Sequence, residues 1–259
     1  MKQRRVEAAG NPLLVQLRRL VQSPTAYRRQ GRVWVEGEHL CAAAVARGVP
    51  VPMAVATDEA LAHPALSGLA RAAAELVTVP AAIFARLSAL GSPAAIAFVL
   101  DAPPAQAPDR ALPSLVLDGV QDAGNVGSLL RSASALGVRQ VLAMTGTAGL
   151  WSPKVLRAGM GAHFGLRLCE GLAPGDLEGW PAPLVATSSH AHAALHEAAL
   201  PPDATWVLGH EGQGVSPALQ ALCAHTVRIP QPGGEESLNV AAAGAICLYE
   251  TLRRRLAAR

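Results

Sequence analysis

The distribution of apolar and polar positions predicts alternating helices and strands along the whole chain. After Asn11-Pro12, leucines and valines recur at helical spacing, which predicts a helix that begins there. Short apolar runs then alternate with longer helical patterns, an order typical of α/β proteins. A polar, basic turn is expected at 27–32. Helices are expected at 38–47 and 61–76, and strands at 33–35, 51–56, 77–79 and 95–100.

The same alternation continues in the second half of the chain. Strands are expected at 115–117, 139–144, 184–187, 205–208 and 226–229, and helices at 128–136, at 151–162 and from 240 onward. Between the halves, residues 101–112 contain three prolines, which predicts a stiff linker. We therefore expect a smaller N-terminal α/β domain over 1–100 and a second α/β domain, with a mostly parallel sheet, over 113–259.

Positive charge is concentrated at the start of the chain. Residues 1–32 contain eight lysines and arginines against one acidic residue, although the net charge of the whole chain is only +3. A basic arm on a slightly acidic body indicates a polyanionic partner, nucleic acid first, and a solvated basic face is the alternative. The arginines of this arm that we expect to contact nucleic acid are Arg18, Arg19, Arg28, Arg29 and Arg32.

Targeting signals and cysteine usage bear on the compartment. The arm is arginine-rich and poor in acids, as transit peptides are, but strand-like sequence at 32–36 follows it directly. No apolar run approaches the ~20 residues of a membrane span, and an apolar signal-peptide core is absent. The four cysteines are widely spaced without a C-x-x-C pair, as expected of core residues in a reducing compartment. We therefore expect a cytoplasmic protein without a membrane partner.

Several stretches carry candidate chemistry at the ends of expected strands. Asn125 and Arg131 follow the strand at 115–117, where a ligand crevice forms outside the carboxyl end of a parallel strand. Either alone would be an ordinary cap or surface charge. Lys154 and Arg157 lie three apart on one expected helix, as candidate phosphate contacts. Three histidines fall within 190–196, but no cysteine or paired carboxylate joins them, so no metal site is expected.

The strand at 205–208 leads into a glycine-rich loop, Gly209-His210-Glu211-Gly212-Gln213-Gly214. Its glycine order, G-x-x-G-x-G, differs from the dinucleotide fingerprint G-x-G-x-x-G, and the lysine and Ser/Thr of a P-loop are missing. Such a loop allows close approach of the backbone to a ligand. The absence of both phosphate-binding patterns disfavours a nucleotide-dependent oxidoreductase or kinase.

A Pro/Gly-rich turn at 230–234 runs into Ser237, Asn239 and a helix of small residues. The free N–H groups of a first helical turn collect at such a junction, so it is a second place for a ligand. An ordinary capped helix is the alternative for this stretch taken alone.

Three segments, in this order, closely resemble the motifs of SpoU-type (TrmH-like) RNA ribose 2′-O-methyltransferases of the SPOUT class. They are Asn125-x-Gly127-x-x-x-Arg131, the segment 208–214, and Ile229-Pro230 followed by Glu236-Ser237-Leu238-Asn239-Val240. The resemblance extends to residues 27–40, which look like the start of the family's substrate-binding domain. The sequence departs from the family pattern at His210, where Asn is more frequent, and at Ala241, where Ser is common.

The resemblance implies a C-terminal α/β-knot domain, with a deep trefoil knot, that binds S-adenosyl-L-methionine. The implied cofactor contacts are Thr187, Gly209, Ile229 and Leu238. The implied reaction is methyl transfer to a ribose 2′-OH of structured RNA by a homodimer joined through the C-terminal domain. Ribosomal RNA is favoured over transfer RNA because a separate N-terminal domain is present. A catalytically inactive RNA-binding relative is the remaining alternative.

The resemblance also implies catalytic roles for Asn125, Arg131, Glu211, Ser237 and Asn239. Proposals within the family make the motif arginine the group that activates the 2′-OH, yet a guanidinium stays protonated in proteins. We therefore expect Arg131 to fix the phosphate and stabilise developing alkoxide, with Glu211 holding Arg131. Asn125 and Asn239 would orient substrate and loop, and Ser237 would contact ribose or phosphate.

Overall fold

The computed structural model describes residues 1–88, 93–233 and 237–258. The chain divides into two compact α/β units. The first unit contains Met1–Pro104 together with Trp151–Phe164, and the second contains Ala105–Leu150 and Gly165–Arg259. The division expected from the sequence placed all of 113–259 in one domain, whereas Trp151–Phe164 groups with the first unit. Of the motif-bearing turn at 230–236, Gly234, Glu235 and Glu236 lie outside the described residues.

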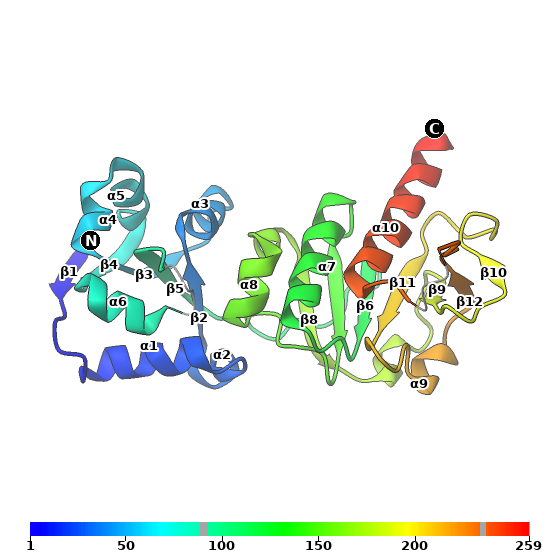
Figure 1. Ribbon diagram of the computed structural model, residues 1–259, viewed down its shortest axis with the longest axis horizontal. Coiled ribbons are helices and arrows are strands. Elements are labelled where there is room, and N and C mark those ends of the chain that lie inside the picture. The colour runs from blue at the N-terminus through cyan, green and yellow to red at the C-terminus, as the bar shows by residue number, and fades with distance from the viewer. Residues whose placement is uncertain (89–92, 234–236, 259) are drawn as a thin grey trace. The chain divides into compact units, whose positions relative to one another are not determined.

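The first unit is built on a five-stranded sheet (Figure 1). Its strands are β1 (Lys2–Arg5), β2 (Arg32–Glu36), β3 (Val51–Ala56), β4 (Ala73–Thr78) and β5 (Ile96–Asp101). In the order β1-β4-β3-β5-β2, the first three strands run parallel, and β5 is antiparallel to both β3 and β2. The strands expected at 33–35, 51–56 and 95–100 are confirmed.

Helices cover both faces of this sheet (Figure 1). One group comprises α1 (Pro12–Gln22), α2 (Ala26–Gln30) and α6 (Ala81–Leu87), and the other α3 (Glu38–Ala46), α4 (Asp58–Ala62) and α5 (Pro64–Ala70). α1 begins where predicted, because the Asn11 side chain accepts a hydrogen bond from the Leu13 N–H at 3.0 Å. Its buried face consists of Leu14, Leu17, Leu20 and Val21.

Two expectations for this unit are wrong. The region 61–76 was expected to be helical, but α5 ends at Ala70 and Ala73–Thr78 forms β4, which pairs with both β1 and β3. Burial between two neighbouring strands overrides the helical preference of its alanines. The basic turn at 27–32 is largely the short helix α2, whose Tyr27 is buried.

The basic segment 1–32 is folded into the unit. β1 pairs with β4, and Arg4 forms an ion pair with Glu75 at 2.8 Å. Arg5 pairs with Asp58 at 2.8 Å, and Arg32 of β2 pairs with Asp101 of β5 at 2.8 Å. Part of the positive charge counted in the sequence is therefore paired with carboxylates of the same unit.

The second unit has a seven-stranded sheet whose recorded pairings are all parallel (Figure 1). Its order is β10-β12-β9-β11-β6-β7-β8. The strands are β6 (Ser114–Asp118), β7 (Gln140–Met144), β8 (Arg167–Leu172), β9 (Leu184–Thr187), β10 (Ala193–Ala194), β11 (Thr205–Gly209) and β12 (His225–Arg228). The expected mostly parallel α/β sheet is confirmed, although β8 and β10 were not predicted.

Two helices of this unit, α7 (Ala123–Ala135) and α10 (Val240–Ala257), pack against each other. Gly244 of α10 makes the approach possible: a Cβ there would lie 2.3 Å from Leu129 of α7 and 2.6 Å from Leu208 of β11. A separate apolar cluster includes Val116, Val207 and Leu219, the last on the short α9 (Pro217–Gln220). Gly244 thus serves the packing of α10 against α7 and β11.

The remaining segment, Trp151–Phe164, carries α8 (Pro153–Gly159), which packs against β2 of the first unit. Its Leu156 belongs to the first unit's core. Cys41, Cys169 and Cys247 are buried and Cys223 is half-buried, as expected of core residues. Burial raises the pKa of the Cys247 thiol to about 12 and that of Cys223 to about 11. None of the helices in the described ranges is long and apolar enough to cross a bilayer.

Candidate active site

Neighbouring parallel strands bring the candidate cofactor residues to one edge of the second sheet. In the order β12-β9-β11-β6, Ile229 follows β12, Thr187 ends β9, Gly209 ends β11 and Asp118 ends β6. Gly209 is buried, and Thr187 and Ile229 are half-buried. Open α/β sheets bind ligands outside the carboxyl ends of their strands, so this edge is the place for a site.

The glycine-rich loop after β11 is closed by a small antiparallel bridge. The His210 N–H donates to the Gly214 carbonyl at 2.9 Å, and the Gly214 N–H donates to the His210 carbonyl at 2.8 Å. Gly214 has a φ of 71°, which a residue with a side chain rarely adopts. His210 Nδ1 accepts from the Gly212 N–H at 3.0 Å, a bond that an asparagine oxygen could accept equally. Glu211 is the first of the three residues that the bridge between His210 and Gly214 encloses.

Gly209 has a structural reason to lack a side chain. A Cβ at this position would lie 2.1 Å from the carbonyl carbon of Gly214 and 2.2 Å from the nitrogen of Val215. The chain that leaves the loop therefore crosses directly over the end of β11. The sequence motif is explained here by contact of backbone with backbone, and any cofactor role of Gly209 has to come from its own N–H and carbonyl.

Glu211 joins this loop to the N-terminus of α7. Its carboxylate accepts hydrogen bonds from the Gln121 and Asp122 N–H groups, both at 3.2 Å, and from Asn125 Nδ2 at 3.0 Å. Burial opposes ionisation of Glu211, but the bonds from Asn125 and from the backbone outweigh it and lower the pKa of its carboxyl. A carboxylate near the first turn of a helix is also favoured by the helix dipole.

Asn239 extends the same network to the third motif. Asn239 Nδ2 donates to Asn125 Oδ1 at 2.9 Å. Asn239 Oδ1 caps α10 by accepting from the N–H groups of Ala241 at 2.9 Å and Ala242 at 3.2 Å. One chain of hydrogen bonds, from α10 through Asn239 and Asn125 to Glu211, therefore links all three motif segments.

Arg131 lies outside this network. It is exposed on α7, and among the described residues its side chain makes no ion pair or hydrogen bond. The expectation that Glu211 holds Arg131 is wrong, because the Glu211 carboxylate is bonded to Asn125 and to backbone N–H groups instead. Ser237 and Leu238 are exposed next to the α10 N-terminus, with Leu238 39% accessible.

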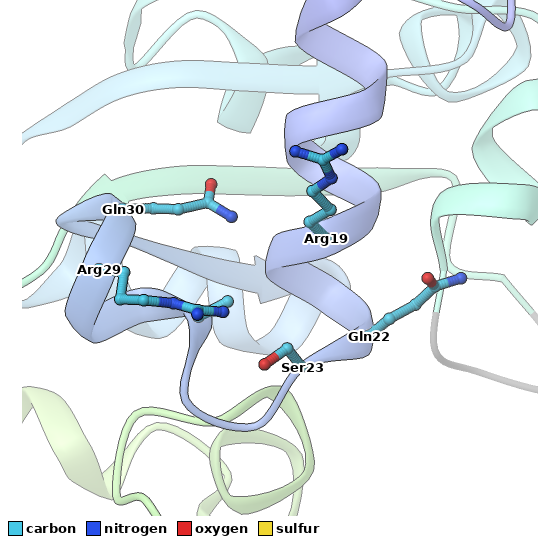
Figure 2. Close-up of a pocket in the computed structure, with 6 residues that line it drawn as sticks. Arg19, Gln22, Ser23, Arg29 and Gln30 are labelled. Atoms are coloured by element: carbon cyan, nitrogen blue, oxygen red, sulfur yellow. The ribbon is translucent and has the colours of Figure 1, made fainter.

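The expected RNA contacts lie in the first unit. Arg18 and Arg19 are on α1, and Arg28 and Arg29 are on α2. Arg28 donates to the Tyr27 hydroxyl at 3.1 Å. Figure 2 shows the hollow that Arg19 and Arg29 line with neighbouring polar residues. Lys154 and Arg157 are exposed on α8 and border a small cavity with Trp34, Glu36 and Leu40 of the same unit.

Sequence reasoning missed three polar groups of the second unit. The Asp122 carboxylate caps α7 by accepting from the Asn125 N–H at 2.7 Å, and its place three residues before Asn125 is a cap signal. Asp118 Oδ2 accepts from the Ser216 N–H at 2.6 Å, which ties the end of β6 to the segment after the loop. Gln231 Oε1 is buried without a hydrogen-bond partner in the described part of the chain. The same described part contains no cluster of metal-ligating side chains.

The parallel sheet, with three motif segments joined at the carboxyl ends of its strands, has the architecture of an α/β methyltransferase. The chain belongs to the SpoU rRNA Methylase family, which it matches over residues 113–249. It is 33% identical to an uncharacterized tRNA/rRNA methyltransferase of Synechocystis sp., an alignment that covers 98% of this chain and 95% of that protein.

Other similarities cover less of the sequence or concern structure. The chain is 37% identical over 150 residues to the 23S rRNA (guanosine-2′-O-)-methyltransferase RlmB of Bordetella pertussis, which covers 54% of this chain and 59% of that protein. A crystal structure of an RNA 2′-O ribose methyltransferase superposes with a TM-score of 0.82 at 32% identity, covering 98% of this chain and all of that one. The SpoU methyltransferase AviRb of Streptomyces viridochromogenes, solved with AdoMet, gives 0.87 at 26% identity, covering 96% and 100%.

Proposed function

We propose that this protein transfers a methyl group from S-adenosyl-L-methionine to the 2′-OH of a ribose in structured RNA, with S-adenosyl-L-homocysteine and the hydroxyl proton as the other products. Ribosomal RNA is the substrate that we favour. The observation that carries the proposal is the hydrogen-bonded chain Glu211–Asn125–Asn239, which assembles the three family motifs at the carboxyl edge of the parallel sheet. Membership of the SpoU rRNA Methylase family supports the reaction, and the name of the related RlmB supports ribosomal RNA over transfer RNA.

The residues at the strand ends fit the cofactor. Thr187, Gly209, Ile229 and Leu238 offer backbone groups and modest apolar surface without a charged side chain among them. Gln231 Oε1, a buried acceptor without a partner in the described ranges, suits an amino group of the cofactor. The cofactor would supply an electrophilic methyl group, and these residues would hold and orient it.

The reaction also requires a grip on the RNA next to the 2′-OH. Arg131 has an exposed guanidinium that no described carboxylate neutralises, so its charge remains available to a phosphate and to the developing alkoxide. Asn125 and Asn239 fix the loop and the starts of α7 and α10. Arg131 lies further along α7, and Ser237 precedes the N-cap of α10. Correct placement of the oxygen and the methyl group can supply ~7–11 kcal/mol of the barrier reduction.

We also propose a homodimer through the second unit, with the knotted topology that the family implies. Ile246, Tyr249 and Leu256 of α10 are 40%, 57% and 57% exposed, and their spacing puts them on one face of the helix. Ile246→Glu is expected to give monomers in sedimentation. The matched change Val45→Glu, at an exposed apolar residue on α3, is expected to leave the assembly intact. If both variants remain dimers, this face of α10 is not the dimer interface.

The test of the proposed function compares substrates directly. The protein is incubated with methyl-labelled S-adenosyl-L-methionine and either ribosomal or transfer RNA, both purified from a strain that lacks the gene. A 2′-O-methyl group removes the nucleophile needed for alkaline cleavage, so labelled, alkali-resistant dinucleotides from ribosomal RNA are expected. Label in transfer RNA alone would support the alternative substrate. Cofactor binding without transfer to either would indicate an inactive RNA-binding relative. A cytoplasmic location follows from the proposed substrate.

A further inference from the structure

The first unit contains a hollow between α1 and α2 with a volume of about 560 Å³ (Figure 2). Its lining residues are Arg19, Gln22, Ser23, Ala26, Arg29 and Gln30. Sites for small organic ligands typically enclose ~300–1,000 Å³, so a hollow of this size can receive a group as large as a nucleotide.

The arginines of the basic segment differ in whether a carboxylate of the unit pairs with them. Arg4, Arg5 and Arg32 each form an ion pair with a carboxylate of the same unit. In contrast, Arg19 and Arg29 make no ion pair or side-chain hydrogen bond among the described residues, and the lining of the hollow includes no acidic side chain. Two uncompensated guanidinium groups at one hollow favour an anion, and guanidinium geometry matches phosphate oxygens.

Apart from Ala26, the other lining side chains carry neutral hydrogen-bonding groups. Figure 2 shows Arg29 and Gln30 extending from α2 toward α1, which carries Arg19. Gln30 Nε2 donates to the Gln16 carbonyl of α1 at 3.5 Å, so its Oε1 remains as an acceptor, and the Ser23 hydroxyl can both donate and accept. A nucleobase edge presents donors and acceptors of this kind, and arginine planes stack on unpaired bases. Inorganic phosphate would use only the arginines.

We propose that this hollow binds one unpaired nucleotide of the RNA substrate, with its phosphate between Arg19 and Arg29 and its base edge toward Gln30 and Ser23. The inference rests on the proposed function, since it assigns a subsite for the same RNA. A base-paired helix keeps its bases stacked inside the duplex and can offer the hollow only its backbone. Loops, bulges and ends supply the unstacked bases that the lining groups can contact.

The test uses the full chain and two short fluorescent RNAs, one a mixed-sequence single strand and one the same sequence as a duplex. Binding is followed by anisotropy over a series of potassium chloride concentrations. The double variant R19Q/R29Q is compared with R47Q/R86Q, which removes two exposed arginines of the same unit that do not line the hollow. The melting temperature and the calorimetric binding of S-adenosyl-L-methionine are measured for each variant as controls for folding and for the second unit. Both quantities are expected to stay unchanged.

For R19Q/R29Q we expect at least ~10-fold weaker binding of the single strand, with the salt slope reduced by ~0.7, since the two arginines hold one phosphate and each phosphate contact contributes ~0.7. Gln30→Ala is expected to weaken binding roughly threefold to tenfold at an unchanged salt slope, because it removes a neutral hydrogen bond. R47Q/R86Q should bind like the parent protein.

The contrary outcomes are separable. Equal losses in both double variants would mean diffuse charge attraction and overturn the subsite, as would duplex binding with the same dependence on Arg19 and Arg29. Competition by an acidic peptide at the hollow, with RNA binding intact in R19Q/R29Q, would assign it to a protein partner instead. If the parent methylates RNA and R19Q/R29Q binds it normally, the subsite alone fails. If the parent binds neither RNA nor the methyl donor, the proposed function fails with it.

Discussion

Asn239 Nδ2 donates a hydrogen bond to Asn125 Oδ1 across 114 residues of sequence, at 2.9 Å. The contact fixes the direction of a whole chain of bonds. Asn239 turns its oxygen toward the first turn of α10, so its amide nitrogen faces Asn125. Asn125 then accepts with its oxygen, and its nitrogen is left for the Glu211 carboxylate, which can only accept when ionised.

Asn239→Asp and Asn239→Ala separate the two roles of this residue. Aspartate retains the cap of α10 but turns an acceptor toward Asn125 Oδ1, whereas alanine loses both functions. We expect Asn239→Ala to lower the free energy of unfolding by about 1 kcal/mol and Asn239→Asp to lower it less, because capping is preserved. Both variants should lose at least ~10-fold in kcat/KM if the link positions the site. Denaturant titration and methyl-transfer kinetics check this, and full activity of Asn239→Asp would show that the link is dispensable.

Gly209→Ala tests the crossing of the chain over β11. The added Cβ would meet backbone atoms of Gly214 and Val215 at 2.1–2.2 Å, where no flexible side chain can move aside. We expect Gly209→Ala to lower the free energy of unfolding by ~4–5 kcal/mol, the upper end of the range for single substitutions, or to prevent folding.

The matched control for Gly209 is Gly212→Ala in the same loop. A Cβ at Gly212 would lie 3.9 Å from the His210 ring, an ordinary contact. Melting curves of the two proteins should therefore differ strongly. Similar curves would mean that the crossing loop can move away from the end of β11 without cost.

Local signals made much of the fold predictable. Asn11-Pro12 marks the start of α1, and the apolar runs before Asp118 and Gly209 mark β6 and β11, because caps and buried parallel strands are encoded over a few residues. The end of β4 falls within the strand expected at 77–79, but its residues 73–76 were expected to be helical, because the neighbouring strands that decide their state are distant in sequence.

The candidate site shows the same limit. The motif residues could be chosen from the resemblance, but their partners could not. The resemblance suggested a salt bridge between Glu211 and Arg131, whereas the fold brings the Glu211 carboxylate to Asn125 and the α7 N-terminus. The grouping of Trp151–Phe164 with the first unit likewise depends on packing of Leu156 into a remote core, which no spacing within the segment encodes.

Glu250 on α10 gives the second unit a pH-dependent contribution to stability. The hydrogen bond from Arg253 is the largest cause, and with that from Arg254 it outweighs burial and lowers the pKa of Glu250 to about 2 from 4.5. A pKa depressed by folding stabilises the native state above the unfolded value, and this contribution is lost as pH falls from about 4.5 to about 2. We expect Glu250→Gln to lose roughly 2 kcal/mol at neutral pH and to converge with the parent in acid. Equal differences at pH values above and below this window would show that the ion pairs do not contribute.

Arg131→Ala tests the division between holding the cofactor and activating the RNA. Within the described ranges Arg131 forms no hydrogen bond or ion pair with the residues that we assign to the cofactor, so calorimetric binding of S-adenosyl-L-methionine should be unchanged. Loss of a charge-assisted donor at the developing alkoxide should lower kcat by ~10²–10³. Arg131→Lys should recover only part of the lost kcat, because an ammonium cannot bind a phosphate in the bidentate manner of a guanidinium.

Arg139→Ala removes an exposed arginine just before β7 and is the charge-matched control. Near-normal turnover by Arg131→Ala, or equal losses in both variants, would remove Arg131 from the catalytic step and leave it as one surface charge among others.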